Sequence, residues 1–215
     1  VFSMMLPLLL TIFLFSSSLA LAPESIAGEK ERGTIATLLV TPIGRGELAL
    51  GKIFSLAILA FLCGMSSTLG TLLSLPKMMQ MQGAPGGAMG MGLYGAKDYL
   101  LLAAVIFSTI LFYVTAMSIV SAYAKSIKEA QNAITPLMIV VMVAGVSSMF
   151  GTVQERAALY LVPVYNSVQS MAGIFSFSYS PANVAIAVGA NLAYSAVGAL
   201  ALTKMFNMEK VIFSR

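Results

Sequence analysis

Histidine and tryptophan are absent from this chain of 215 residues, cysteine occurs once, and only 9% of the residues are charged. An ordinary soluble domain has about 25% charged residues. The lack of histidine excludes a histidine-based zinc protease, and the single Cys63 excludes a disulfide framework and a cysteine-based metal site. Because hydrophobic residues make up 59% of the chain, we predict an integral membrane protein.

Charged residues are also missing from the interior of the apolar runs. A carrier driven by a proton or sodium gradient usually keeps an ionisable group at the middle of the membrane, so this absence disfavours a secondary transporter. Serine and threonine are frequent, as in residues 16–18 and 66–68, but no base is available to activate them as nucleophiles. We interpret them as helix-packing residues and expect no enzymatic activity, metal or cofactor in this chain.

The apolar residues themselves form five runs, each long enough to cross roughly 30 Å of hydrocarbon as an α-helix. They predict an all-α, polytopic transmembrane helical bundle that occupies residues 1–215 as one domain. The chain starts at Val1 inside an apolar run, so we expect that a first span precedes it. The predicted spans cover residues 2–23, 48–73, 99–123, 133–151 and 182–203.

Lysine and arginine show which connections face the cytosol, because cytosolic connections are enriched in them. Nine of the twelve fall in residues 24–52, in 124–132 or after the last span, and three fall on the other side. We therefore predict a multi-pass protein of the cell membrane whose segment 24–47 and C-terminus are cytosolic. The three basic residues on the other side are Lys77, Lys97 and Arg156.

The two outer connections differ in kind. Residues 77–97 are rich in glycine and methionine without periodicity, which indicates a flexible loop; a copper site built on its thioethers is an alternative. Residues 152–181 are semi-apolar and interrupted by Pro163 and Pro181, which predicts short re-entrant helices packed against protein. Five amides are candidates for lining a pathway or for joining helices: Asn132, Asn166, Gln169, Asn183 and Asn191.

The first cytosolic segment, residues 24–47, carries the most specific pattern. A short amphipathic helix is predicted from Thr34, a candidate N-cap, to the stop at Pro42, with Ile35, Leu38 and Leu39 on one face. Such an apolar face needs a covering partner, so we favour a docking element over a solvated loop. Upstream, alternating charges run from Glu29 to Arg32, and Gly33 permits a bend.

The same segment contains G-x-x-x-x-G-K at residues 46–52, which resembles the start of a phosphate-binding loop. A true loop of this type needs serine or threonine next and a preceding strand, whereas Ile53 and an apolar run follow here. We therefore predict that this chain does not bind ATP itself.

Residues 26–52 resemble the first cytosolic connection of ABC transporter type-2 permeases, most of all the sodium-efflux, Nat-type permease-like branch. The resemblance rests on GEKERGT at 28–34, LL at 38–39, TPI at 41–43, Arg45, EL at 47–48 and GK at 51–52, and extends to NAITP at 132–136 and VPVYN at 162–166. The first span and the extracellular domain of that branch are missing.

The resemblance implies an exporter membrane domain in which the first cytosolic connection is a coupling helix docked on a separate ABC ATPase subunit. It also implies a homodimer or a pairing with a second permease, set in membrane lipid, with no nucleic-acid partner. An ATP-independent channel or carrier and a non-transporting membrane anchor are the alternatives. The expected ATPase-docking residues are Glu29, Glu31, Arg32, Gly33, Thr34, Ile35, Leu38 and Leu39.

Overall fold

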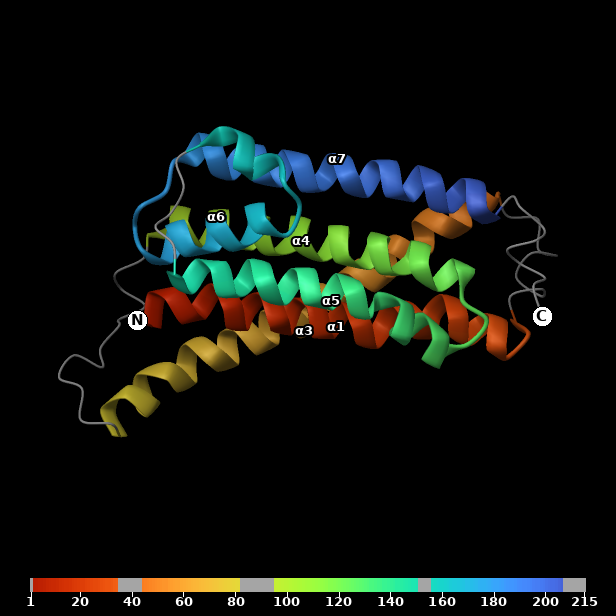
Figure 1. Ribbon diagram of the computed structural model, residues 1–215, viewed down its shortest axis with the longest axis horizontal. Helices are drawn as coiled ribbons and strands as arrows, with labels where there is room; N and C mark the ends of the chain where they lie inside the picture. Colours follow the sequence, from red (N-terminus) through yellow and green to blue (C-terminus); the bar gives the residue numbers. More distant parts are fainter. Residues whose placement is uncertain (1, 35–43, 82–94, 151–155, 207–215) are drawn as a thin grey trace.

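The computed structural model describes residues 2–34, 44–81, 95–150 and 156–206, which form helices packed side by side (Figure 1). A 3-10 helix, η2 (Ala157–Leu161), and a short α-helix, α6 (Tyr165–Phe175), accompany the long helices. These described ranges contain no β-strand. The long helices are α1 (Phe2–Glu31), α3 (Arg45–Met81), α4 (Ala96–Tyr123), α5 (Ile127–Phe150) and α7 (Pro181–Phe206).

All five long helices are long and apolar enough to cross a membrane. Their mean hydropathies range from 1.6 to 2.3 over the most apolar windows, which confirms the prediction of an all-α polytopic membrane protein. The least apolar of them is α5, whose first turns carry Lys128, Glu129 and Asn132.

Helical structure extends beyond the predicted spans. α1 continues through the charged residues to Glu31, α3 continues to Met81, and α5 begins at Ile127. Hydropathy marks where side chains stop being apolar, whereas backbone hydrogen bonds allow a helix to continue into the polar region. With 30 residues, α1 is ~45 Å long and exceeds the ~30 Å hydrocarbon core. Residues 35–43 and 82–94, with the predicted amphipathic turn and most of the methionine-rich loop, lie outside the described residues.

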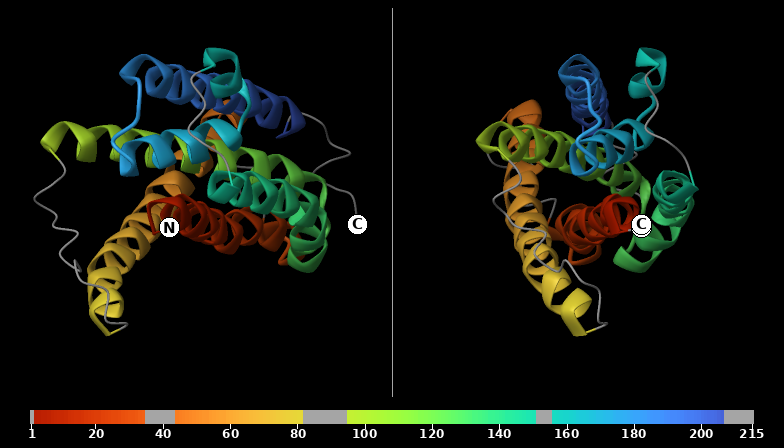
Figure 2. Two further views of the ribbon diagram at one scale, coloured as in Figure 1. Left: turned by 60° about the vertical axis from the view of Figure 1, so that its left-hand side comes forward. Right: turned by 90° about the vertical axis from the view of Figure 1, so that its left-hand side faces the viewer.

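The core of the bundle lies around α1 and α4. α4 is 61% buried over its most apolar window, against 22% for α5 and 28% for α7, so α4 is the most enclosed long helix. α1 lies between α3 and α5 in the end-on view of Figure 2. The largest fully buried side chains around them include Leu10, Leu14, Ile106, Ile110 and Tyr113, and the Tyr113 ring meets Phe15 edge-on with centroids 5.5 Å apart.

Large apolar side chains cover the outside of α3, α5 and α7. Ile58 and Leu62 on α3, Val143 on α5, and Val197 and Leu200 on α7 are all more than half exposed. In water such a surface would be unfavourable, whereas hydrocarbon chains solvate it without loss. The bundle therefore presents an apolar outer surface of the kind that suits a membrane.

Glycines allow the long helices to approach one another closely. A Cβ atom on Gly64 of α3 would lie 2.6 Å from Leu14 Cδ2 of α1, and one on Gly198 of α7 would lie 2.5 Å from Thr115 Cγ2 of α4. Helices in a membrane gain little from the hydrophobic effect against each other, so this close van der Waals packing holds them together.

Gly198 and Gly189 lie on the same helix and provide a matched test of this packing. Gly198→Ala should destabilise the protein by about 1–3 kcal/mol, because Thr115 is β-branched and cannot easily move away. A Cβ atom added to Gly189 would meet no atom within 4 Å, so Gly189→Ala should be neutral or stabilising by up to about 1 kcal/mol. Thermal unfolding of the purified variants, followed by circular dichroism, measures both; equal stabilities would contradict the packing role.

Candidate functional site

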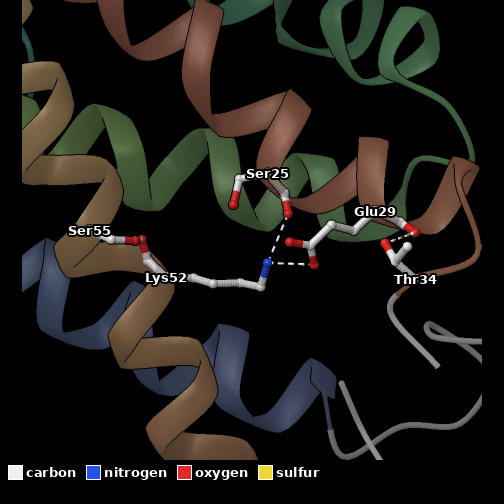
Figure 3. Close-up of polar contacts among 5 residues, drawn as sticks. All are labelled: Ser25, Glu29, Thr34, Lys52 and Ser55. Atoms are coloured by element: carbon white, nitrogen blue, oxygen red, sulfur yellow. Dashed lines mark hydrogen bonds and ion pairs between the residues drawn. The ribbon is translucent and has the colours of Figure 1, made fainter. Parts of the chain in front are cut away.

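The end of α1, the start of α3, the α4–α5 turn and the end of α7 meet at one end of the bundle, here called the Lys52 end. Lys52 extends from α3 to the last turns of α1 (Figure 3). Its Nζ donates to Glu29 Oε2 at 2.6 Å and to the Ser25 backbone oxygen at 2.9 Å. The two side chains are 10% and 23% exposed, so water screens the ion pair only in part. These bonds fasten α3 to α1.

Lys30 and Glu31 fasten α1 to the turn between α4 and α5. The Lys30 ammonium donates to the backbone oxygens of Ala122 at 2.6 Å and Ala124 at 3.3 Å, at the end of α4. Glu31 Oε2 accepts the backbone N–H of Ile127 at 3.0 Å, at the start of α5. A cation at a helix C-terminus and an anion at a helix N-terminus both complement the helix dipoles. The end of α1 thereby provides hydrogen-bond partners for backbone groups at both ends of the turn.

The start of α5 has its own hydrogen bonds that keep the turn in place. The Ser126 hydroxyl accepts the N–H of Glu129 at 3.2 Å, and Glu129 Oε2 accepts the N–H of Lys125 at 2.7 Å, an arrangement like a capping box. Gly28 of α1 faces this start: a Cβ on it would lie 3.2 Å from Ile127 Cδ1. The α4–α5 turn is therefore packed and hydrogen-bonded to the end of α1.

α1 ends in an exposed edge formed by residues 31–34. Gly33 has φ of +72°, the left-handed conformation that commonly ends a helix, and its N–H donates to the Lys30 oxygen at 3.0 Å. The Thr34 hydroxyl donates back to the backbone oxygen of Glu29 at 3.2 Å. Glu31, Arg32, Gly33 and Thr34 are all exposed. This edge presents the Glu31 carboxylate, the Arg32 cation and the Thr34 hydroxyl to the surroundings of the Lys52 end.

The predicted docking residues thus divide into three groups. Glu29 and Glu31 contact other helices of the same chain, whereas Arg32, Gly33 and Thr34 are the rest of the exposed edge that begins at Glu31. Ile35, Leu38 and Leu39 lie outside the described residues, so the apolar docking face stays a prediction.

Sequence reasoning missed the partners of the acidic pair. Lys52 was recognisable only as part of the family pattern, although Glu29 and Lys52 flank a short connection between two antiparallel helices, which is a usable signal. Nothing in the sequence links Lys30 to Ala122, because the two residues are 92 positions apart.

This arrangement is suited to mechanical transmission. An exposed edge lies directly on a junction at which α1, α3, α4 and α5 are joined by charged hydrogen bonds. A rigid junction of this kind moves several helices together when its edge is displaced. Among the described residues, no group of three or more acidic or cysteine side chains could hold a metal ion there.

The fold and this junction define a polytopic membrane protein with a polar, solvent-facing end. The family model described as ABC-2 family transporter protein matches residues 1–209, nearly the whole sequence. The chain belongs to the ABC-2 transporter family, as a membrane-spanning permease component. The match is to the family as a whole, and the sodium-efflux branch stays a prediction. No curated protein and no solved structure matches the chain.

The junction makes a direct prediction for Lys52. Lys52→Met removes both bonds to α1 and should lower the free energy of unfolding by about 2 kcal/mol. In the exchanged pair Glu29→Lys with Lys52→Glu, attraction returns but the bond to the Ser25 oxygen does not, so stability should recover only in part. A double-mutant cycle measured by thermal unfolding should give an interaction energy of about 1 kcal/mol.

Ser55→Ala is the control for this cycle, because the Ser55 hydroxyl donates to the Lys52 oxygen of its own helix and is exposed. Its stability should stay within about 0.5 kcal/mol of wild type. Strictly additive effects of the two charge changes would refute the coupling between α1 and α3.

Proposed function

We propose that this chain is the permease subunit of an ATP-driven exporter, and that a separate ABC ATPase subunit docks at the Lys52 end. The ATPase binds and hydrolyses ATP, while this chain forms the membrane path and performs no chemistry. Membership of the ABC-2 family supports the pairing with an ATPase. The observation on which this proposal rests is the exposed edge 31–34, because it adjoins a junction of four helices.

The proposed coupling works by displacement. When two ATPase subunits close on ATP, the docked edge moves, and the bonds of Glu29, Lys30 and Glu31 transmit this movement to α3 and to the α4–α5 turn. α3, α4 and α5 then shift together with α1, which bears the edge, relative to the partner permease. The acidic pair acts inside the permease in this scheme, and the contact with the ATPase falls to Arg32 and the residues that follow it.

The charge distribution supports a cytosolic position for the Lys52 end. Arg32, Lys128 and Lys204 are exposed there, in addition to the bonded Lys30 and Lys52. At the opposite end the described residues include Lys97 and Arg156. An excess of cations on one side is typical of cytosolic ends, so the protein would be a multi-pass protein of the cell membrane with its coupling edge inside.

The exposed apolar faces of α3, α5 and α7 provide room both for lipid and for a second permease copy. We propose a homodimer or a pair with a related permease, as the family resemblance implies. The resemblance to the sodium-efflux branch makes sodium one candidate cargo, beside peptides, drugs and lipids.

Arg32→Glu tests the docking edge. Arg32 is exposed, so its reversal should leave the stability of the permease within about 0.5 kcal/mol of wild type, while co-purification with the ATPase falls several-fold. Lys97→Glu is the matched control, because Lys97 is also exposed, carries the same charge and lies at the other end of the bundle. Bound ATPase and ATP turnover are measured for both variants in purified complexes.

Each result of this comparison selects one function. Loss of ATPase binding in Arg32→Glu alone supports docking at the edge, whereas equal binding in both variants removes the edge from the interface. If the wild-type permease binds no ATPase, an ATP-independent channel or carrier replaces the proposal. If the ATPase binds but its turnover does not respond to the permease, the anchor function replaces it.

A further inference from the structure

The segment from η2 to α6 forms a hairpin beside α7, with η2 on the outside and α6 on the inner side (Figure 1). The Tyr194 hydroxyl of α7 donates to the Leu161 oxygen at 3.0 Å, and the Asn166 amide donates to the Ala187 oxygen at 3.2 Å. Both contacts lie well along α7 from its start at Pro181. The tip of the hairpin, residues 161–166, is therefore beside the middle of α7, ~15 Å from Pro181 at the level of Asn191.

The tip contains a strained residue. Val164 has φ of 71° and ψ of −57°, and the N–H of Tyr165 donates to the Pro163 oxygen at 2.9 Å, which together define a γ-turn with positive φ. A β-branched residue is rarely found in this conformation. Val164 is also 2% exposed. Contacts with the surrounding helices must hold such a turn in place, because its local preference opposes it.

A network of buried side chains supplies these contacts. Asn166 Nδ2 donates to Asn191 Oδ1 at 2.9 Å, and Asn191 Nδ2 donates to Ser167 Oγ at 2.9 Å. The Thr109 hydroxyl of α4 lies 2.8 Å from Ser167 Oγ. All four side chains are at most 1% exposed, and they join α4, α6 and α7. An unsatisfied polar group at this depth would be unfavourable, so the network has one strongly preferred geometry.

The helix that the network anchors is enclosed by protein. Every residue from Asn166 to Phe175 of α6 is buried, although α6 is ~16 Å long and too short to cross a membrane. The Ser170 side chain lies one turn beyond Asn166, is 1% exposed, and its hydroxyl has no hydrogen-bond partner among the described residues. A probe placed at Ser170 therefore reports whether α6 stays enclosed, without breaking a bond.

We propose that Asn191 is a positioning residue that holds the hairpin tip at the middle of the membrane domain against the strain at Val164. It does so by accepting a hydrogen bond from Asn166 and donating one to Ser167. This requires a side chain that carries both an acceptor and a donor, as an amide does. When the pair of bonds is lost, the tip withdraws from α7 and α6 becomes accessible to water. This role is independent of ATPase docking at the Lys52 end.

Accessibility of a cysteine at position 170 tests the proposal. Ser170→Cys is introduced together with Cys63→Ser, and the purified protein in detergent is treated with a charged methanethiosulfonate reagent. The parent should react slowly, and addition of Asn191→Leu should raise its labelling rate at least about tenfold, since a buried network that loses both bonds shifts its opening equilibrium by at least that factor. Ser195→Ala is the matched control, because Ser195 is buried on the same helix and, among the described residues, its hydroxyl bonds only to the backbone oxygen of Asn191 in that helix.

Asn191→Asp distinguishes positioning from general destabilisation. A protonated aspartic acid can accept from Asn166 and donate to Ser167 as asparagine does, whereas the ionised form cannot donate. Its partners in the network, Thr109, Asn166 and Ser167, do not titrate, so a pH dependence specific to this variant comes from the new carboxyl. Labelling, expressed relative to the parent at the same pH, should match the parent at low pH, where the carboxyl is protonated, and approach that of Asn191→Leu at high pH, where it is ionised.

Two outcomes would overturn the proposal. One is an Asn191→Leu variant that is labelled no faster than Ser195→Ala. The other is an Asn191→Asp variant that is labelled as fast as Asn191→Leu even at low pH. Size-exclusion chromatography and circular dichroism of each variant show that the protein compared is folded. Because the measurement needs no ATPase, its failure would leave the proposed export function untouched, and loss of ATPase docking would leave this result untouched.

Discussion

The requirement that every backbone polar group be satisfied away from water governs this fold. Long helices meet it by themselves along their length, so the remaining demands fall on helix ends and on the hairpin between η2 and α6. At the ends, Lys30 and Glu31 provide the missing donor and acceptor for the α4–α5 turn. In the hairpin, the Tyr194 hydroxyl provides a donor for the backbone oxygen of Leu161, where η2 ends. Both sets of contacts also fix how the helices lie against one another.

Composition and apolar run length were sufficient to predict the all-α membrane bundle, because a helix that crosses a bilayer must be both apolar and long enough to span the hydrocarbon. The helix ends were less predictable, since the charged residues from Glu29 to Glu31 remain helical after hydropathy has fallen. The amides were recognised as candidates, but only the structure shows that Asn166 and Asn191 join two helices while Asn132 is exposed. Contacts between side chains of helices that are far apart in the sequence produce no periodic pattern in a single sequence.

The candidate site illustrates the same limit. The segment around Glu29 lies at a polar end of the bundle. Its acidic pair was expected to face a partner, yet Glu29 and Glu31 both contact helices of the same chain. Charge alone does not distinguish an ion pair inside a protein from one across an interface. The distinction came from geometry: Lys52 is one helix away from Glu29 and only 10% exposed.

The bond from Lys30 to the end of α4 has a consequence for biogenesis. Lys30 is synthesised long before Ala122 and Ala124, so its ammonium must remain hydrated until α4 has been inserted. The same holds for Glu31 and the start of α5. The end of α1 therefore acquires its final partners only when the second helical hairpin is complete, and a chain interrupted before α4 would leave this charged helix end hydrated and accessible to quality-control proteases.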